Sequence, residues 1–279
     1  GDYAFANITA LKSISVPDSV KTIGNNTFQN DKNLKEVVFD ADGLLTEIGN
    51  SAFQSTGIES LELPKGVTTI GTSAFSSCAS LTNVKLSENL TEISATLFSK
   101  CSLLSSITIP KGVTIIGKNA FQSCTKLEAI VIPKGVTEIA DYAFTSSEIL
   151  QKVTLSNVVK IGFGSFASTS VSGNHQLDKL VSVGDYAFQN TYLTTFNAPN
   201  LEKIGIAAFE NNQLLTSFVF GSNLKEVGKK AFDGCVNLVN YYYDNPTTGQ
   251  KVTTFKLNDY AYLKDSILYT KLPNGKYQL

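Results

Sequence analysis

The sequence predicts a solenoid, an elongated stack of about eleven coils that each contain 21 to 25 residues. Three observations predict it: a phenylalanine returns at that spacing, the run Ile-Gly-x-x-Ala-Phe-x-x-Cys-x-x-Leu returns around it, and one unit has too few apolar residues to bury a core alone. A fixed period of this length is typical of repeat architectures, in which each coil buries its apolar side chains against its neighbours. The recurring phenylalanines are Phe5, Phe28, Phe53, Phe75, Phe98, Phe121, Phe144, Phe166, Phe188, Phe209 and Phe232.

The first element of each unit is a short strand. In the unit that begins at Leu127, Ile130 and Ile132 alternate with other positions, and this period of two predicts a strand. Pro133 cannot donate a hydrogen bond to a sheet, so we expect it to end the strand. Equivalent strands of neighbouring coils should pair in parallel on one face of the stack.

The second element is a turn that contains the phenylalanine. Val136 and Ile139 predict a second inward-facing corner, and a glycine follows at the same place in most units. A side chain at that glycine would crowd the backbone. The next residues, x-x-Ala-Phe, predict a short helical or 3₁₀ turn. The recurring glycines are Gly24, Gly49, Gly71, Gly117, Gly162, Gly184, Gly205 and Gly228.

The unit after Phe166 departs from the pattern. Counting back from Gly184 places Asn174 and Gln176 at two positions that other units make apolar, with His175 between them on the outer face. Two alternatives remain open: the amides are satisfied by polar neighbours, or the strand is out of register. The composition of residues 167–174 favours a local disruption.

The repeat fails after Asn245-Pro246. We therefore predict two parts: a repeat array at 1–245, which starts in the middle of a unit, and a C-terminal cap at 246–279. The end of a solenoid exposes an apolar cross-section that a cap must cover. Within the cap, Asn274-Gly275 between two strand-like runs predicts a β-hairpin.

The composition excludes several classes of function. A net charge of −1 supplies no basic surface for nucleic acid or anionic lipid. The single histidine leaves no constellation for metal binding or general-base catalysis, so we expect a non-enzymatic chain with no cofactor and no metal site. The run Gly162-Phe-Gly-Ser-Phe-Ala167 spells a nucleotide motif but is the repeat itself. Asp40, Asp42 and Glu47 lack the further ligands of a calcium loop and indicate an acidic turn.

The cysteines indicate packing. Cys78, Cys101, Cys124 and Cys235 each follow a repeat phenylalanine by three residues, and Ser147 occupies this place in another unit. We expect a column of buried, reduced thiols that act as small, weakly polar side chains.

The run Ile-Gly-x-x-Ala-Phe-x-x-Cys-x-x-Leu-x-x-Ile-x-Ile-Pro resembles the BspA-like leucine-rich repeats, also called the Treponema pallidum type. The resemblance covers residues 1 to about 243. It implies a right-handed, curved leucine-rich-repeat solenoid with a parallel sheet on its concave face. It also implies a bacterial cell-surface or secreted protein, and some relatives act as adhesins for host matrix proteins or other bacteria.

The repeat leaves one set of strand residues unspecified, and these point outward. They form a mostly neutral column that we take as the candidate binding surface, because curved solenoids bind through such faces. Tyr242 is the expected aromatic anchor. The candidate residues are Glu62, Lys85, Thr108, Val131, Thr154, His175, Asn197, Val219 and Tyr242.

We therefore expect a monomeric, extracellular or cell-surface bacterial protein that binds a protein ligand, either a host matrix protein or another bacterial surface protein. A glycan-binding module, which would use the tyrosines near Tyr242, is one alternative. A structural spacer in a larger surface protein is another. We expect no nucleic-acid partner and no insertion of this segment into a membrane.

Overall fold

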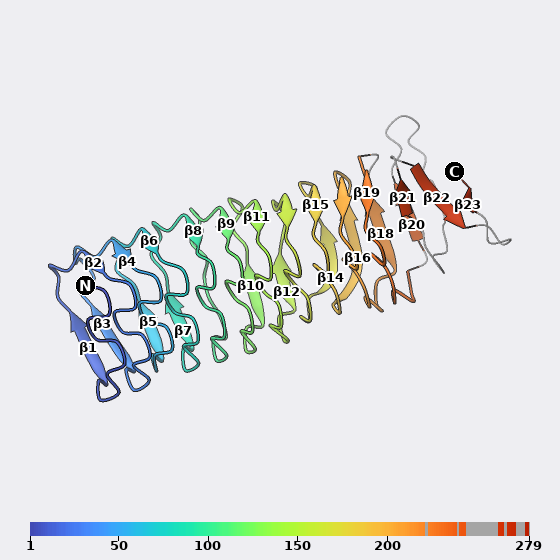
Figure 1. Cartoon of the computed structure of the whole chain (residues 1–279). Helices are drawn as coiled ribbons and strands as arrows, with labels where there is room; N and C mark the ends of the chain where they lie inside the picture. Colours follow the sequence, from blue (N-terminus) through green and yellow to red (C-terminus); the bar gives the residue numbers. More distant parts are fainter. Residues whose placement is uncertain (221–222, 239, 244–261, 265–266, 272–276, 279) are drawn as a thin grey trace.

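The computed structural model is an elongated parallel β-solenoid with the character of a leucine-rich repeat, which confirms the predicted fold class (Figure 1). It describes residues 1–220, 223–238, 240–243, 262–264, 267–271 and 277–278, with side chains described as far as residue 238. No helix in this part of the chain is long and apolar enough to cross a membrane.

Most coils contribute a strand to the first row, which we call the strand face, and the coil that contains Thr108 follows the same path without a strand. The pairing is parallel and joins equivalent residues of adjacent coils, for example Ile130 with Val153. The inward residue of each pair is buried and the outward residues are exposed, as the period of two predicts. The strands of this row are β1 (Ser13–Val16), β3 (Glu36–Phe39), β5 (Ser60–Glu62), β7 (Asn83–Lys85), β10 (Ala129–Val131), β12 (Lys152–Thr154), β14 (Ser172–Gln176), β16 (Tyr192–Ala198), β18 (Ser217–Phe220) and β20 (Asn240–Tyr243).

A second row of two-residue strands precedes the phenylalanine turn. Each strand buries its second residue and pairs in parallel with the next coil, as Ile139 pairs with Ile161. The strands are β2 (Thr22–Ile23), β4 (Glu47–Ile48), β6 (Thr69–Ile70), β8 (Glu92–Ile93), β9 (Ile115–Ile116), β11 (Glu138–Ile139), β13 (Lys160–Ile161), β15 (Ser182–Val183), β17 (Lys203–Ile204) and β19 (Glu226–Val227).

The core is a set of stacked columns between the two rows. The eleven repeat phenylalanines form one continuous stack from Phe5 to Phe232, with successive ring centroids 5.1 to 5.8 Å apart. From Phe53 to Phe209 these rings are fully buried. Burying one such side chain contributes roughly 1.5–3 kcal/mol, so the coils are stabilised chiefly by contact with their neighbours.

The residues around each phenylalanine form turns, and the described part of the chain contains no helix. The prediction of short helical or 3₁₀ segments was therefore wrong. In a helix these amides would bond within their own segment. Here Asn119, Phe121 and Ser123 donate to carbonyls of the next coil at 3.0, 2.7 and 2.9 Å. Every second amide in the turn thus points to the next coil. The backbone is left-handed two residues before and two residues after the phenylalanine, at Asn119 and Ser123 in this coil.

The recurring glycine meets the backbone of the coil before it. A Cβ on Gly49 would lie 2.7 Å from the amide nitrogen of Asn25 and from the carbonyl carbon of Gly24. The expected crowding is therefore confirmed, and its cause is the close approach of two coils at this corner.

Three further strands lie beyond the array: β21 (Tyr262–Lys264), β22 (Ile267–Lys271) and β23 (Tyr277–Gln278). They pair antiparallel, and β21 lies against β19. The predicted hairpin turn at Asn274-Gly275 lies outside the described residues. That residues 246–279 cap the array stays a prediction.

Candidate interaction surfaces

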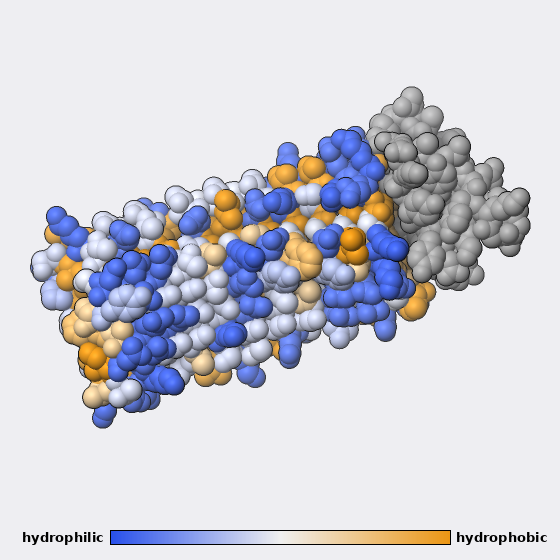
Figure 2. All heavy atoms as spheres, in the orientation of Figure 1, coloured by the Kyte–Doolittle hydropathy of each residue, from blue (hydrophilic) through white to orange (hydrophobic). Residues whose placement is uncertain are grey.

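Five of the nine predicted binding residues form an exposed column on the strand face. Glu62, Lys85, Val131 and Thr154 are outward residues of β5, β7, β10 and β12, and Thr108 is exposed at the equivalent place in the intervening coil. Val131 is 70% exposed and is the one apolar side chain among these five. On the face seen in Figure 2, the described surface is mainly hydrophilic to neutral, and apolar residues are most numerous toward its C-terminal end.

Some of the charges on the solenoid surface are paired between coils. On the strand face Lys85 binds Glu62, and at the edge of the second row Lys160 binds Glu138 at 2.8 Å. The hydrogen bond from Lys160 to Glu138 raises the pKa of the lysine. Such exposed pairs contribute at most about 1 kcal/mol each, and they leave no strong field of either sign. Similar pairs join Lys35 to Glu59, Lys203 to Glu226 and Lys225 to Glu202.

His175 does not lie in the outward column, so its predicted position was wrong. The pairing of β14 with β16 shifts between Gly173 and Asn174, after which His175 pairs with the buried Phe196. Gly173, which has a φ of 88°, pairs with Leu193, and Asn174 pairs with Thr195, so the extra residue of this bulge is Thr194 of β16. A shift of one residue exchanges the two faces of a strand. Of the two alternatives left open, the strand is out of register.

The register shift gives both amide side chains polar partners on the outer face. Asn174 Oδ1 accepts hydrogen bonds from the hydroxyls of Thr194 and Thr195 at 2.8 and 2.9 Å. Gln176 Oε1 accepts one from Asn197 Nδ2 at 2.7 Å. Buried amides would have needed equivalent partners inside an apolar core, so the shift avoids an unsatisfied polar group.

His175 is half-buried at the edge of the core. Its Nε2 donates a hydrogen bond to the Ser172 carbonyl at 3.2 Å. Burial lowers the pKa of His175 more strongly than this hydrogen bond raises it. The imidazole is therefore neutral at pH 7 and has no charge to offer a ligand.

The remaining predicted binding residues differ in how far they are exposed on the strand face. Asn197 is half-exposed and points outward. Val219 pairs with Asn197 in register but is only 7% exposed, so the prediction that it is an exposed member of the outward column was wrong. Its strand, β18, is paired on both sides, whereas β10, which carries Val131, pairs with β12 alone. Tyr242 lies in β20, and its side chain is outside the described residues.

The four cysteines are free and buried, as predicted. Cys101 Sγ donates to the Phe75 carbonyl of the preceding coil at 3.2 Å, and Ser147 Oγ makes the equivalent bond to Phe121 at 2.8 Å. Burial raises the pKa of Cys78 to about 11 and that of Cys124 to about 12. The thiols therefore stay protonated and act as donors. Within the described residues, no group of three or more side chains of the usual ligand types could hold a metal ion.

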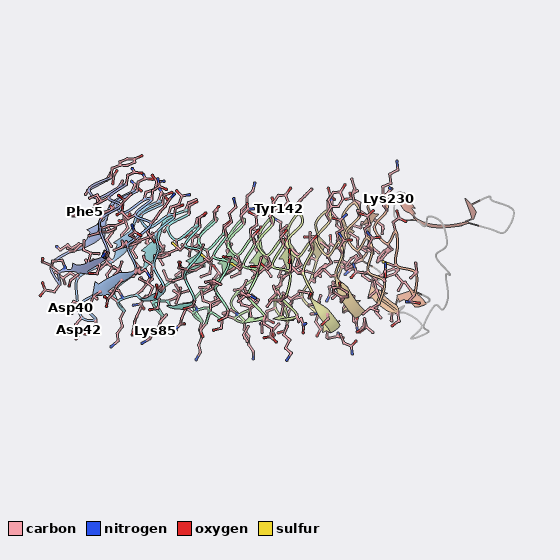
Figure 3. All side chains as sticks on the ribbon, turned by 90° about the horizontal axis from the view of Figure 1, so that it is seen from below. Phe5, Asp40, Asp42, Lys85, Tyr142 and Lys230 are labelled. Atoms are coloured by element: carbon pink, nitrogen blue, oxygen red, sulfur yellow. The ribbon has the colours of Figure 1, made fainter. Side chains whose placement is uncertain are left out.

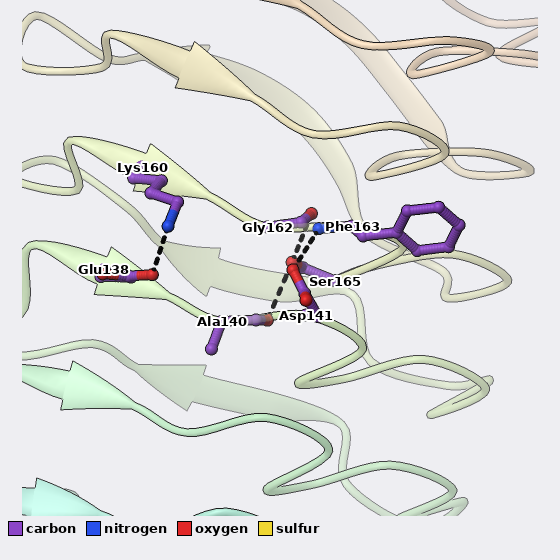
Figure 4. Close-up of polar contacts among 7 residues, drawn as sticks. All are labelled: Glu138, Ala140, Asp141, Lys160, Gly162, Phe163 and Ser165. Atoms are coloured by element: carbon purple, nitrogen blue, oxygen red, sulfur yellow. Dashed lines mark hydrogen bonds and ion pairs between the residues drawn. The ribbon is translucent and has the colours of Figure 1, made fainter.

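The sequence reasoning missed a row of three aromatic side chains on the turn corner. Tyr142, Phe163 and Tyr186 come from consecutive coils, just after β11, β13 and β15. The centroid of Phe163 lies 5.0 Å from that of Tyr142 and 5.4 Å from that of Tyr186. Figure 3 shows Tyr142 on the outer surface, and Figure 4 shows Phe163 directed away from the coils. Their recurrence at neighbouring places in three successive units was the available signal.

Comparison with known proteins identifies the repeat. The family model described as "BspA type Leucine rich repeat region" matches in six copies, over residues 1–114, 46–172, 91–213 and 181–274. No curated protein matches the chain.

Solved structures share the fold. The pneumococcal vaccine antigen PcpA is 24% identical, over 85% of this chain and 69% of that one, with a TM-score of 0.52. A leucine-rich repeat protein from Bacteroides ovatus is 21% identical, over 86% of this chain and 68% of that one, also with a TM-score of 0.52. At these identities the likeness concerns the fold alone.

Proposed function

Because the chain belongs to the BspA-type leucine-rich repeat family, we propose that it is a non-enzymatic, protein-binding module at the surface of a bacterium or outside it. The observation that carries the proposal is the continuous exposed column from Glu62 to Thr154 on one face of a stacked scaffold. The name of the similar pneumococcal structure, a vaccine antigen, supports a location accessible from outside the cell.

The strand face suits a protein ligand for two reasons. Apart from Thr108, its outward side chains come from paired strands, so little entropy is lost when a partner orders them. They are short and mostly neutral, and the exposed Val131 supplies an apolar contact between Thr108 and Thr154. Broad contact across several coils is the usual way in which solenoids bind. A host matrix protein or another bacterial surface protein is the proposed ligand.

The test is a binding screen with two variants of matched chemistry. The purified chain is immobilised and exposed to host matrix proteins and bacterial surface fractions at micromolar concentration. A partner retained by the strand face should bind at least about tenfold more weakly to Val131→Arg, because a long charged side chain disrupts the centre of a neutral interface. Thr137→Arg is the control, since Thr137 is exposed beside the second row of strands.

Two outcomes would overturn the proposal. One is that no protein is retained by the wild-type chain. The other is that every retained protein binds Val131→Arg and wild type equally. A glycan array run in parallel, with Tyr242→Ala as its control, tests the sugar-binding alternative, since loss of a glycan signal in that variant would assign the ligand to the tyrosines near the end of the array.

A further inference from the structure

The aromatic row of Tyr142, Phe163 and Tyr186, which we call the aromatic corner, lies away from the strand face. The three rings are half-exposed and are tilted against one another by 50° and 52°. Ile206, 44% exposed, extends the apolar surface into the next coil. In the coils on either side of this region, polar or small residues occupy the equivalent places. The corner is therefore a local feature that the repeat does not require.

The backbone at the corner is unfavourable for tyrosine. Tyr142 and Tyr186 both have a φ of 57°, in the left-handed region that bulky residues rarely adopt. Most other coils place a smaller or polar residue there, for example Ser73, Asn119 or Ala207, although the first coil places Tyr3 there with a φ of 56°. In the intervening coil Gly164 holds this position, and a Cβ on it would lie 3.1 Å from Cδ1 of Tyr142. Gly164 thus leaves room for the Tyr142 ring beside Phe163, and side-chain exposure rather than backbone preference accounts for the tyrosines.

Two carboxylates flank the middle ring. Asp141 Oδ1 accepts a hydrogen bond from the Phe163 amide at 2.8 Å, and Asp185 Oδ1 accepts one from the Ile206 amide at 2.7 Å. Asn25 and Asn50 make the same bond to the next coil in other units, both at 2.8 Å. The hydrogen bond therefore needs an oxygen and not a charge.

Neither carboxylate has an ion-pair partner among the described residues. Lys160, whose charge interacts with that of Asp141, is held by Glu138 instead (Figure 4). The aromatic corner therefore combines three aromatic rings with two carboxylates that form no ion pair among the described residues. Attraction to a cation increases when both features act on the same group.

We propose that the aromatic corner binds an arginine or lysine side chain presented by a protein partner. The cation lies against the exposed parts of the rings, within reach of Asp141 or Asp185. Charge complementarity distinguishes this ligand from a neutral sugar, which would use the rings and be indifferent to the carboxylates. The inference does not depend on the proposed function of the strand face, which lies on different residues.

Every variant for the test uses a residue that another coil already places in the same position. Asp141→Asn with Asp185→Asn removes both charges and keeps the hydrogen bonds, as Asn25 and Asn50 do. Phe163→Thr copies Thr72, and Tyr142→Ser copies Ser73. Glu36→Gln with Glu88→Gln removes two exposed charges elsewhere and controls for net charge. Thermal unfolding verifies that each variant is folded.

The probe is a fluorescein-labelled peptide of four Gly-Ser-Arg units, and the reference peptide carries Gln in place of Arg. We expect fluorescence polarisation to show saturable binding of the arginine peptide alone. Affinity should fall about three- to tenfold in the double Asp→Asn variant and in the Phe163→Thr variant. Glu36→Gln with Glu88→Gln should bind as wild type does.

Three results would overturn the proposal. If the arginine peptide does not bind, or if the Asp→Asn and Glu→Gln pairs weaken binding equally, no specific cation site exists at the aromatic corner. If Phe163→Thr abolishes binding while the Asp→Asn pair leaves it unchanged, the rings bind a neutral group such as a sugar. The Val131→Arg variant should still bind the arginine peptide, because Val131 lies on the strand face and not at the aromatic corner. A failure of the strand-face proposal can therefore be told from a failure of this one.

Discussion

At the scale of single residues, one buried position in each coil from Phe28 onward donates a hydrogen bond to a phenylalanine carbonyl, either of the preceding coil or, as for Thr56, of its own coil. The position lies three residues after the repeat phenylalanine and holds Cys, Ser, Thr, Asn or Asp. Cys101, Ser147 and Asn212 all donate to a phenylalanine carbonyl of the preceding coil. Asp31 is the exception, because a carboxylate has no proton to donate, and its buried Oδ2 has no partner.

We expect Asp31→Asn to stabilise the protein by about 1–3 kcal/mol at pH 7, the usual cost of a buried unsatisfied group. Asn212 shows the geometry: its Nδ2 donates to the carbonyls of Phe188 and Phe209 at 2.6 and 2.9 Å. Burial raises the pKa of Asp31, so the folded protein favours the protonated carboxyl. The protein is therefore more stable below the ordinary pKa of 3.8, and it loses this stability as the pH rises and the buried carboxyl must ionise. Urea unfolding at pH 7 and pH 4 should show a gain that shrinks at the lower pH. An equal gain at both would refute this explanation.

The cysteine column gives a second prediction. Cys101→Ser should have a small effect on the free energy of unfolding, because Ser147 makes the equivalent hydrogen bond. Cys101→Val removes the donor to the Phe75 carbonyl and should cost about 1 kcal/mol more than Cys101→Ser. Urea denaturation of the two variants measures the difference. If the Cys101→Val variant is as stable as the Cys101→Ser variant, the side chains of the cysteine column stabilise the protein through their volume and not through this hydrogen bond.

At the scale of elements, strand β14 contains a side chain, His175, that makes the stability of the protein depend on pH. Because burial lowers the pKa of His175, the unfolded chain binds its proton more readily. Stability is therefore full above the unfolded pKa of about 6.5 and falls as pH drops through it towards the folded value. We expect His175→Phe, which extends the buried column of Phe196 and Phe218, to abolish this loss between pH 7 and pH 5. Thermal unfolding across that range is the measurement, and a slope unchanged in the variant would contradict it.

Sequence periodicity predicts an element well only where every coil has the same number of residues between its landmarks. Ile130 and Val153 follow the count and lie where it places them. His175 does not, because it precedes Gly184 by nine residues, as Phe196 precedes Gly205, whereas Ile130 precedes the equivalent Ala140 by ten. The turns around Phe121 failed for another reason: their amides serve the next coil, and a local pattern contains no information about that partner.

The contrast between positions set by regular spacing and positions set by contacts with another coil also explains which interaction surface the sequence predicted. The exposed column of Glu62, Lys85, Thr108, Val131 and Thr154 follows directly from alternation along a strand. The aromatic corner does not, since Phe163 precedes its repeat phenylalanine by three residues, whereas Tyr142 and Tyr186 precede theirs by two. Their rings meet only because Gly164 makes room between them.

At the scale of the whole molecule, stability is a sum over neighbours. Each coil pairs and stacks with the coil before it and the coil after it, so a change at one end should affect only the coils nearby. Residues 246–279, which we predict to cap the array, include β21, and this strand lies against β19. Their removal tests both the cap and the local character of the stability.

We expect a chain of residues 1–245 to unfold at a lower temperature than residues 1–279, because the apolar end of the last coil becomes exposed to water. Amide hydrogen exchange should locate the loss. Protection of Phe218 and Gly228 should fall, since they lie in the terminal coils, while that of Phe121, buried at the centre of the array, should stay unchanged. Equal protection in both chains would show that residues 246–279 do not cap the array. A uniform fall from Phe5 to Phe232 would show instead that the coils unfold as one cooperative unit.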